Sequence, residues 1–472
     1  MDATPIPIAG TPTTTDATVD VTNPFTQEVI AAMPLCGPEE VDRACRHAAA
    51  VLAEGSFPQH ERAAVLDRAA VLLAERTEDL ARTIATEAGK PIRTARVEVA
   101  RAVDTFRFAA AEARHLSGEV IPLEASSSGA GKVGFALRVP AGVVAAISPF
   151  NFPLNLVAHK VAPAIAAGCP VVLKPAPQTP LTSVALVQLL VDAGMPEGWI
   201  SIVTDSRAEA GGPLVEHPVP AVVTFTGSVP VGWGIAAAAP RKRVLLELGS
   251  NSPLIVMPDT DVEDLARRLA PASFGFAGQS CISVQRILAH QDIHGALVEA
   301  LAEATDALVV GDPLDEATDV GPLIAPGEID RVKSWIDAAA EAGGRVVAGG
   351  RLEDGLLRPT VVDGVDVSCD LWRKEVFGPA VGVRSVASFD EAVTLANDSD
   401  FGLHVGVFTK DIGLAMRAAR ELDFGGILVN EVPTWRADQQ PYGGVRDAGN
   451  TREGPAYTVE EMTTLRFVTL QG

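Results

Sequence analysis

The chain has 472 residues, of which 47% are hydrophobic, so it has enough apolar side chains for two or three domain cores. Its formal net charge of -22 argues against nucleic acids and anionic membrane surfaces as partners, because both would repel it. Its five cysteines are scattered without the spacing of a disulfide framework or a zinc site. We therefore expect no bound metal and a reducing, cytoplasmic location.

The N-terminal third predicts an arm, then helices, then a hairpin. Residues 1–20 are rich in Thr, Pro and Ala, which predicts a loose arm. They lack a basic stretch followed by an apolar run, so we expect no secretory signal. Over 38–116, Ala, Leu and Val recur every three or four residues, as in amphipathic helices. Over 118–140 the periodicity falls towards two around a Ser-Gly-rich tip, which predicts a long hairpin. Polar residues and prolines interrupt the longest apolar run, 157–173, so we expect no membrane span.

Short apolar strands then alternate with helices, a pattern typical of a parallel α/β sheet covered on both faces. In the first such region we expect strands at 143–147, 171–173, 221–225 and 244–246, and a helix at 182–193. A second alternating region follows, with helices at 262–269 and 293–307 and strands near Val346, Val381 and Gly406. The final run, 463–470, is rich in β-formers and could pair with the hairpin of a neighbouring subunit.

Two segments of the first α/β region suit a nucleotide. Thr226-Gly227-Ser228 links a predicted strand to a predicted helix, and backbone amides at that helix start would suit a pyrophosphate. The chain lacks a Gly-x-Gly-x-x-Gly fingerprint in this region, so an ordinary loop is an equally good interpretation. Lys174 also follows a strand, where it could reach a phosphate or ribose or could be a solvated loop lysine.

Three further residues suggest covalent chemistry, and a fourth, Glu375, offers a carboxylate next to a rigid turn. Cys281, which follows Gly278-Gln279-Ser280, could be a nucleophile, although a single cysteine in an apolar stretch is more often inert. Asn151 lies in a proline-bounded turn and could donate to an oxyanion or simply form the turn. Glu247 ends an apolar strand, where burial would raise its pKa towards that of a general base, or it could be a paired structural carboxylate. Glu375 precedes the Phe377-Gly-Pro turn, which could also be a surface loop.

Read together, these motifs resemble in order and spacing those of the aldehyde dehydrogenase superfamily, from about Asn23 to Leu470. The resemblance implies an α/β fold with two parallel-sheet domains and a β-hairpin oligomerisation element. Residues 1–118 and 141–249 would form the cofactor-binding domain, 250–446 the catalytic domain, and 119–140 with 447–472 the element that joins a homodimer or homotetramer.

The resemblance also implies roles for individual residues. Cys281 would be the nucleophile, Glu247 the general base, and Asn151 an oxyanion donor together with the backbone amide of Cys281. The expected chemistry is oxidation of an aldehyde to a carboxylic acid through a thiohemiacetal and a thioester. The residues expected to hold the dinucleotide are Ser148, Phe150, Lys174, Pro177, Gly227, Ser228, Glu375 and Phe377.

Departures from the family pattern bear on the cofactor. Pro177 stands where many members have a glutamate that binds the adenosine ribose. The lost carboxylate removes a repulsive charge against a 2′-phosphate while Lys174 remains. We therefore predict NADP or NAD as the cofactor, with NADP accepted and preferred. Phe150 replaces the more frequent Trp, and Gly-Ser-Asn at 249–251 leaves the preceding base intact.

By the same resemblance, the residues that line or approach the aldehyde tunnel would be Arg107, His159, Ser280 and Arg436. The arginines predict a small polar or anionic aldehyde, unless they pair with structural carboxylates such as Asp438. The chain resembles branches acting on lactaldehyde, phosphorylated or phosphono aldehydes and semialdehydes, but it lacks the histidine and arginine that branches for phosphorylated substrates often carry at Phe152 and Ser280.

Two alternative functions remain at this point. The chain could transfer the acyl group to coenzyme A, although that branch typically lacks the base that Glu247 would provide. It could also be a non-catalytic dinucleotide-binding protein of the same fold, which the presence of Cys281, Glu247 and Asn151 disfavours.

Overall fold

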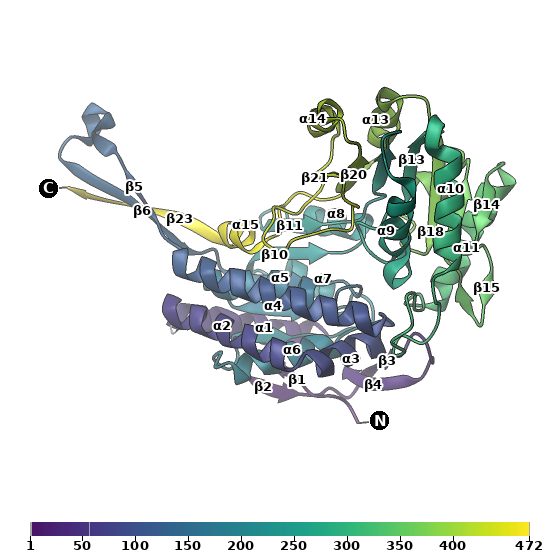
Figure 1. Cartoon of the computed structure of the whole chain (residues 1–472). Coiled ribbons are helices and arrows are strands. Elements are labelled where there is room, and N and C mark those ends of the chain that lie inside the picture. Colours follow the sequence, from purple (N-terminus) through teal and green to yellow (C-terminus); the bar gives the residue numbers. More distant parts are fainter. Residues whose placement is uncertain (1, 56, 472) are drawn as a thin grey trace.

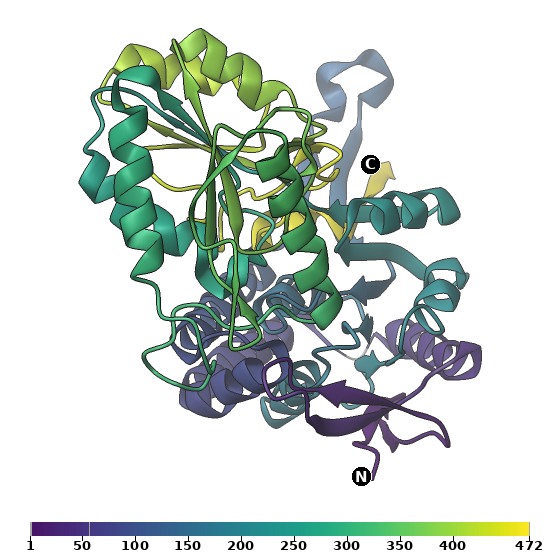
Figure 2. The same ribbon diagram turned by 90° about the vertical axis from the view of Figure 1, so that its right-hand side faces the viewer.

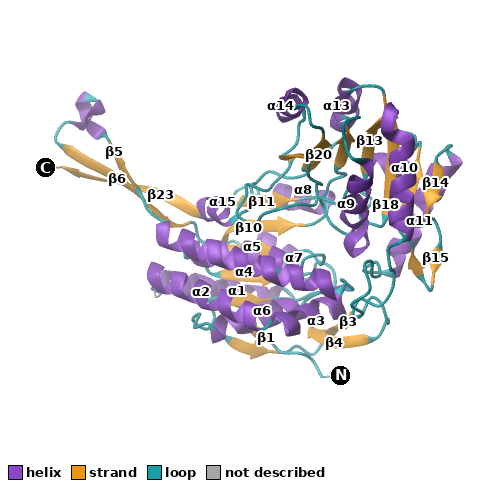
Figure 3. Cartoon of the chain, viewed as in Figure 1, coloured by secondary structure: helices purple, strands orange, loops and turns teal. Residues whose placement is uncertain are grey.

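The structure is a computed structural model that describes residues 2–55 and 57–471. Two α/β units lie side by side, and a narrow β-sheet projects from one of them (Figure 1). Helices cover the strands of both units, as the predicted α/β class requires (Figure 3). None of the helices in the described ranges is both long enough and apolar enough to cross a membrane.

The first unit is built on a five-stranded parallel sheet with the order β11-β10-β7-β8-β9. Its strands are β7 (Val143–Ile147), β8 (Val171–Lys174), β9 (Ile200–Ile202), β10 (Pro220–Thr226) and β11 (Arg243–Glu247). Every residue of β7 and β8 is buried, because helices cover both faces of the sheet. The four strands predicted in this region are confirmed.

The register of this sheet brings distant motifs to one edge. Ile147 pairs with Lys174 and Thr226 pairs with Glu247. Because all five strands are parallel, their carboxyl ends lie together, and the turns that follow β7, β8, β10 and β11 share that edge. The helices around the sheet are α1 (Pro38–Glu54), α2 (Gln59–Glu75), α3 (Thr77–Ala88), α4 (Ile92–His115), α5 (Asn155–Ala167), α6 (Leu181–Asp192), α7 (Gly211–Glu216) and α8 (Val229–Ala238).

The prediction of a loose N-terminal arm is wrong. Residues 6–34 form two antiparallel strand pairs, β1 (Ile6–Ile8) with β2 (Thr11–Thr13) and β3 (Thr18–Thr22) with β4 (Val29–Pro34). Ile6 and Ile8 are completely buried in the core of the first unit. Burial of these apolar side chains offsets the entropy lost in ordering a segment with many turn residues.

The second unit contains a seven-stranded sheet with the order β14-β17-β18-β13-β12-β20-β21. Only its edge strand β14 runs antiparallel to its neighbour. Its strands are β12 (Pro253–Val256), β13 (Arg286–His290), β14 (Arg345–Ala348), β17 (Thr360–Asp363), β18 (Ala380–Val386), β20 (His404–Phe408) and β21 (Gly426–Val429). Its helices are α9 (Val262–Phe274), α10 (Gln291–Asp306), α11 (Pro326–Glu341), α12 (Asp370–Arg373), α13 (Phe389–Asn397) and α14 (Ile412–Glu421).

The projecting sheet has the order β23-β6-β5 and extends well beyond the first unit (Figures 1 and 2). It consists of β5 (Glu119–Ile121), β6 (Lys132–Pro140) and β23 (Thr463–Gln471), with α15 (Pro455–Glu461) just before the last strand. The predicted hairpin is confirmed. The expectation that the terminal strand pairs with another subunit is corrected: β23 pairs with β6 of its own chain, Phe467 opposite Ala136. The helix α15 brings the end of the chain back to β6. The terminal strand β23 can then pair with the backbone groups at the edge of β6.

Apolar side chains remain exposed on this projecting sheet. Val120 and Phe467 expose 81% and 53% of their surface. Such a surface suits contact with another subunit, and the homodimer or homotetramer stays a prediction. The three sheets fall within the predicted ranges 141–249, 250–446, and 119–140 with 447–472. The functions assigned to those ranges likewise stay predictions.

Candidate active site

A cavity of about 550 Å³ opens at the carboxyl edge of the five-stranded sheet. Its wall contains all the residues predicted to hold the dinucleotide, namely Ser148, Phe150, Lys174, Pro177, Gly227, Ser228, Glu375 and Phe377. The hydroxyl of Ser148 is buried and has no hydrogen-bond partner among the described residues. An unsatisfied hydroxyl in the wall of a largely apolar cavity fits a polar ligand, and the size of the cavity fits a nucleotide.

Both α/β units contribute to this cavity. Ser228 stands just before α8, and the rings of Phe150 and Phe377 meet edge to face at 5.8 Å. Glu375 accepts a hydrogen bond from the backbone N–H of Ser250 at 2.9 Å, and burial raises the pKa of its carboxyl to about 7. A Cβ atom at Gly249 would lie 2.2 Å from Oε2 of Glu375, so only glycine allows this approach.

Lys174 has a partner that the sequence did not indicate. Its ammonium lies 2.7 Å from Oδ1 of Asp205, a completely buried residue that follows β9. The other carboxylate oxygen of Asp205 accepts from the backbone N–H groups of Ala210 and Gly211. The Lys174 charge is therefore held in place and partly neutralised before any ligand binds.

The loop before Cys281 has a constrained backbone. Phe276 and Ala277 have φ values of 51° and 53°, a left-handed conformation that costs L-residues roughly 1–2 kcal/mol each. Gly278 follows with φ of 70°, and a Cβ atom there would lie 2.2 Å from the carbonyl oxygen of Gly378. The turn aims Cys281 at the first cavity, whose wall it joins.

Asn151 lies in the same wall as Cys281. Its Nδ2 donates to the carbonyl oxygen of Gln279 at 3.0 Å, which links its loop to the cysteine loop. The backbone N–H of Cys281 donates no hydrogen bond within the described chain, so it is available to an incoming oxygen. Asn151 and Cys281, which are far apart in the sequence, are thus brought together.

A buried ion pair holds the Asn151 loop in place. Glu98 on α4 accepts from the backbone N–H groups of Leu154 and Asn155, at 2.9 and 3.1 Å, and also pairs with Lys90. The Lys90 ammonium lies 3.6 Å from the centre of the Phe152 ring. Both charged side chains are completely inaccessible to solvent, and neither was singled out from the sequence.

Glu247 ends β11 and is buried as predicted, but it does not line the first cavity. A Cβ atom at Gly443 would lie 2.9 Å from its Oε1, so the absence of a side chain at Gly443 makes room for the carboxylate. Neither oxygen has a hydrogen-bond partner among the described residues. Burial, followed by the negative charge of Glu453, raises the pKa of Glu247 well above its usual value.

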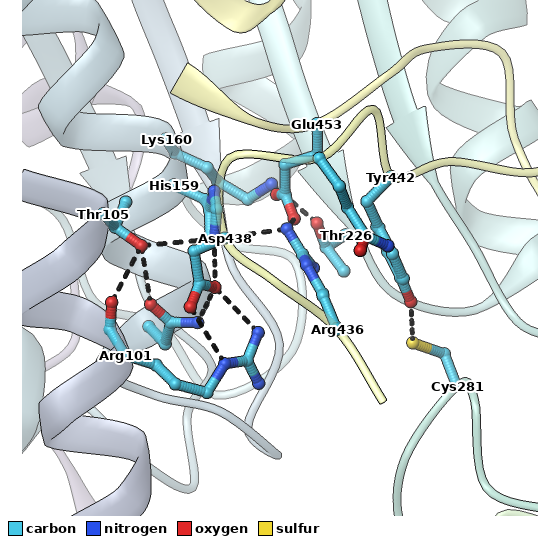
Figure 4. Close-up of polar contacts among 12 residues, drawn as sticks. Arg101, Thr105, His159, Lys160, Thr226, Cys281, Arg436, Asp438, Tyr442 and Glu453 are labelled. Atoms are coloured by element: carbon cyan, nitrogen blue, oxygen red, sulfur yellow. Dashed lines mark hydrogen bonds and ion pairs between the residues drawn. The ribbon is translucent and has the colours of Figure 1, made fainter. Parts of the chain in front are cut away.

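Glu453 belongs to a buried charge network beside this carboxylate (Figure 4). It accepts from Nη2 of Arg436 at 2.8 Å, and each side chain exposes only 4% of its surface. Burial acts to raise the pKa of Glu453, but its cationic neighbours outweigh burial and lower it to about 2. Lys160, one of these neighbours, donates to Thr226 at 2.6 Å. Glu453 thus stays ionised, and of the two carboxylates Glu247 is the one that takes up a proton more readily.

A second cavity of about 160 Å³ lies on the other side of Cys281. Of the predicted substrate residues, Ser280 and Arg436 line it, whereas His159 and Arg107 do not. His159 is completely buried behind the wall, where its Nε2 lies 2.9 Å from Oδ1 of Asp438 and 3.1 Å from Nη2 of Arg436. It supports the wall and does not form it.

The prediction for Arg107 is wrong. Its side chain is exposed on α4 and pairs with Asp104 at 3.3 Å. Thr105 faces inward to His159, and two further residues along a helix rotate the side chain by roughly 200° to the opposite face. Arg101, one turn before Thr105, lines the second cavity instead and grips Asp438 through Nε and Nη2, at 3.1 and 2.8 Å.

Tyr442 is a further residue of the site that sequence reasoning missed. Its hydroxyl lies 2.9 Å from Sγ of Cys281, and it lines the second cavity (Figure 4). The chain has only two tyrosines, and this one stands in a Pro-Tyr-Gly-Gly turn in a segment otherwise rich in polar residues. An aromatic residue isolated in such a segment was the signal that the sequence offered. The sequence could not indicate that Cys281 is its partner.

Comparison with known proteins agrees with this geometry. The sequence profile of the aldehyde dehydrogenase family matches residues 11–468. The chain belongs to the aldehyde dehydrogenase family. A 3-sulfolactaldehyde dehydrogenase from Priestia aryabhattai is 44% identical over 97% of this chain and 96% of its own length. The chain is thus an enzyme, an oxidoreductase of the aldehyde dehydrogenase family.

Two solved structures are similar throughout. Aldehyde dehydrogenase 21 from Physcomitrella patens, in complex with the reaction product succinate, is 38% identical with a TM-score of 0.96, covering 100% of this chain and 98% of that one. A glyceraldehyde-3-phosphate dehydrogenase from Methanocaldococcus jannaschii, complexed with NADP, is 36% identical with a TM-score of 0.92, covering 97% and 100%. The predicted fold is confirmed, as is the cofactor class, because aldehyde dehydrogenases use NAD or NADP.

Proposed function

We propose that this aldehyde dehydrogenase converts a small anionic aldehyde to its carboxylic acid through a covalent intermediate on Cys281. The observation that carries the proposal is that Cys281 lines both cavities. An aldehyde in the smaller cavity and a dinucleotide in the larger one would meet at its sulfur. Leu156 also lines both cavities, but of the two only the cysteine can attack an aldehyde carbon.

Each step has a residue suited to it. The Cys281 thiolate attacks the aldehyde carbon, and the resulting oxyanion takes hydrogen bonds from Nδ2 of Asn151 and the backbone N–H of Cys281. When NAD or NADP is bound, its nicotinamide supplies the hydride acceptor. The thioester left on Cys281 is released by a water molecule that gives its proton to Glu247. This use of Glu247 disfavours acyl transfer to coenzyme A, for which no such base is required.

We propose that NADP is the preferred cofactor. Pro177 lines the cavity without adding a carboxylate, and Arg207 lines an adjoining cavity of about 300 Å³ together with Lys174. Lys174 is already paired with Asp205, so Arg207 is the cation left for a 2′-phosphate, in a wall that also contains Glu216. The NADP bound to the M. jannaschii relative supports the same choice.

Steady-state kinetics on a panel of aldehydes, run with NAD and NADP in parallel, is expected to show aldehyde-dependent cofactor reduction. One charge-assisted hydrogen bond to a 2′-phosphate should favour NADP about tenfold in kcat/KM. A preference for NAD above tenfold would contradict the cofactor proposal. Cofactor binding without reduction, across the whole panel, would instead indicate the non-catalytic alternative.

The anionic substrate is proposed from two arginines in the smaller cavity. Nε of Arg436 is buried and lacks a hydrogen-bond partner among the described residues, although Nη2 of the same side chain pairs with Glu453. Arg101 faces the same space, with Asp438 holding two of its nitrogens. Some N–H groups of these arginines thus pair with structural carboxylates, which was the alternative raised from the sequence. Their other N–H groups are left for a ligand.

The substrates after which relatives are named support this choice. The P. aryabhattai relative is called a 3-sulfolactaldehyde dehydrogenase, and a 37% identical relative from Pseudomonas canavaninivorans is called an aspartate-semialdehyde dehydrogenase. The moss structure holds succinate. These substrates or products carry a sulfonate or a carboxylate remote from the reacting carbon, which the two arginines would bind through charge-assisted hydrogen bonds.

Replacement of Arg436 or Arg101 by leucine is expected to lower kcat/KM about 10- to 100-fold for an aldehyde ending in a carboxylate, but much less for its uncharged amide. The ratio of kcat/KM for the two substrates corrects for any loss of activity that comes from leaving Glu453 or Asp438 unpaired. Arg107→Leu is the matched control, because it removes the same charge from the exposed face of α4. An unchanged ratio in both cavity variants would rule out an anionic substrate held there.

A further inference from the structure

The hydroxyl of Tyr442 contacts the sulfur of Cys281, and its ring is held from two sides. The Arg436 guanidinium lies 3.8 Å from the ring centre, and the His404 ring packs edge to face at 5.0 Å. His404 is itself fixed by a hydrogen bond between Nδ1 and the carbonyl oxygen of Pro433 at 2.8 Å. Tyr442 exposes only 3% of its surface, and contacts with these two neighbours hold its hydroxyl 2.9 Å from the sulfur.

We propose that Tyr442 is a further catalytic residue, which donates a hydrogen bond to Sγ of Cys281 and so favours the reactive thiolate. This role rests on the proposed function, since it presumes that Cys281 is the nucleophile. A thiolate has no proton to donate, so the phenol must be the donor once the thiol has ionised. Burial raises the pKa of Tyr442 well above its usual value, so its proton stays on the oxygen throughout.

The surroundings of Cys281 show why a donor is needed. Burial raises the pKa of its thiol to about 12, and the nearby carboxylates of Glu375 and Glu247 act in the same direction. The hydrogen bond from Tyr442 and the charge of Arg436 oppose them. The remaining titratable neighbour, His404, adds no charge at neutral pH, because burial lowers its pKa to about 4. Tyr442 is thus the donor in direct contact with the sulfur.

The proton balance of the step is simple. The thiol proton leaves to solvent water in the cavity, while Tyr442 keeps its own proton and donates a hydrogen bond to the sulfur. When another lone pair of the sulfur forms the C–S bond, the sulfur loses its negative charge and becomes a much weaker acceptor. The hydrogen bond therefore stabilises the thiolate before attack, and its loss should raise the thiol pKa. The nucleophilicity of a thiolate falls as its pKa falls. A tenfold gain in the thiolate fraction therefore increases the rate of attack only about threefold.

The first test measures the rate of Cys281 alkylation by iodoacetamide against pH, followed on the Cys281 peptide by mass spectrometry. Tyr442→Phe is expected to raise the apparent thiol pKa by about one unit and to slow alkylation below that pKa about threefold. Tyr457→Phe is the matched control, because the only other tyrosine is 39% exposed. An unchanged pKa in Tyr442→Phe, or faster alkylation below that pKa, would overturn the proposal.

A second measurement keeps the hydroxyl of Tyr442 and so does not depend on the folding of Tyr442→Phe. In Tyr457→Phe protein grown with 3-fluorotyrosine, Tyr442 is the sole fluorinated residue, because the chain has two tyrosines. Its fluorine resonance is expected to titrate with the Cys281 thiol, and this titration should vanish in an added Cys281→Ser change. A resonance that ignores the state of Cys281 would overturn the proposal.

Different results would refute the proposed function and the role of Tyr442. Full aldehyde oxidation by Cys281→Ser would remove the proposed function together with this role. Loss of oxidation in Cys281→Ser, with an unshifted thiol pKa in Tyr442→Phe, would leave the proposed function standing and remove only the role of Tyr442.

Discussion

Replacement of Cys281 by serine is expected to lower kcat/KM for aldehyde oxidation at least about a thousandfold. The substitution keeps the size of the side chain and a hydrogen-bonding partner for Tyr442, but a serine hydroxyl is far harder to ionise than a thiol and cannot form a thioester. The rate is measured as reduction of NAD or NADP on excess aldehyde. Unfolding curves that match those of the wild type would exclude loss of structure as the cause.

The matched control is Cys369→Ser. Cys369 is also partly buried, but it lies just before α12 and lines neither the cofactor cavity nor the smaller one. We expect it to retain wild-type activity. Oxidation by Cys281→Ser within tenfold of the wild type would mean that the aldehyde is attacked by another group, and the assignment of both cavities to one reaction would have to be abandoned.

Replacement of Glu247 by glutamine is expected to lower the steady-state rate about 100- to 1,000-fold while leaving a first turnover intact. Glutamine fills the space beside Gly443 but cannot accept a proton from water, so the thioester should accumulate. Rapid mixing should show a burst of close to one equivalent of reduced cofactor per active site. Mass analysis of the quenched protein should find the acyl group on the Cys281 peptide.

The pH dependence of hydrolysis checks the same residue. Glu247 acts as a base only when ionised, so wild-type thioester hydrolysis should fall as pH decreases through its pKa, which burial and Glu453 hold well above the usual carboxyl range. Glu247→Gln should lack this dependence. Wild-type turnover by the variant would exclude Glu247 as the base, and a wild-type requirement for coenzyme A as acceptor would support the acyl-transfer alternative.

The residues that we propose for cofactor binding could be grouped from the sequence because most of them follow strands. Apolar runs at 143–147, 171–173, 221–225 and 244–246 indicated parallel strands, and their carboxyl ends must share one edge of a sheet. Residues just beyond those ends, such as Ser148, Lys174 and Ser228, therefore face a common space. The resemblance to a family added Glu375 and Phe377, which come from the other unit.

The substrate side was less predictable because it depends on which face of each element turns inward. Helical periodicity shows that α4 has an apolar face, yet it does not say which arginine at its margin meets the Asp438 segment. The structure selects Arg101 and turns Arg107 to solvent. The sequence likewise could not indicate that Glu453 would neutralise part of Arg436.

By itself, then, the sequence determined the main strands and helices beyond the N-terminal segment and the chemical types gathered at the ends of the parallel strands, because periodicity and turn residues act over a few neighbouring positions. Only the tertiary structure decided that Tyr442 contacts Cys281, that Asp205 meets Lys174, and that β23 pairs within its own chain. Those contacts join residues tens to hundreds of positions apart. They are set by the packing of whole units, which no local pattern records.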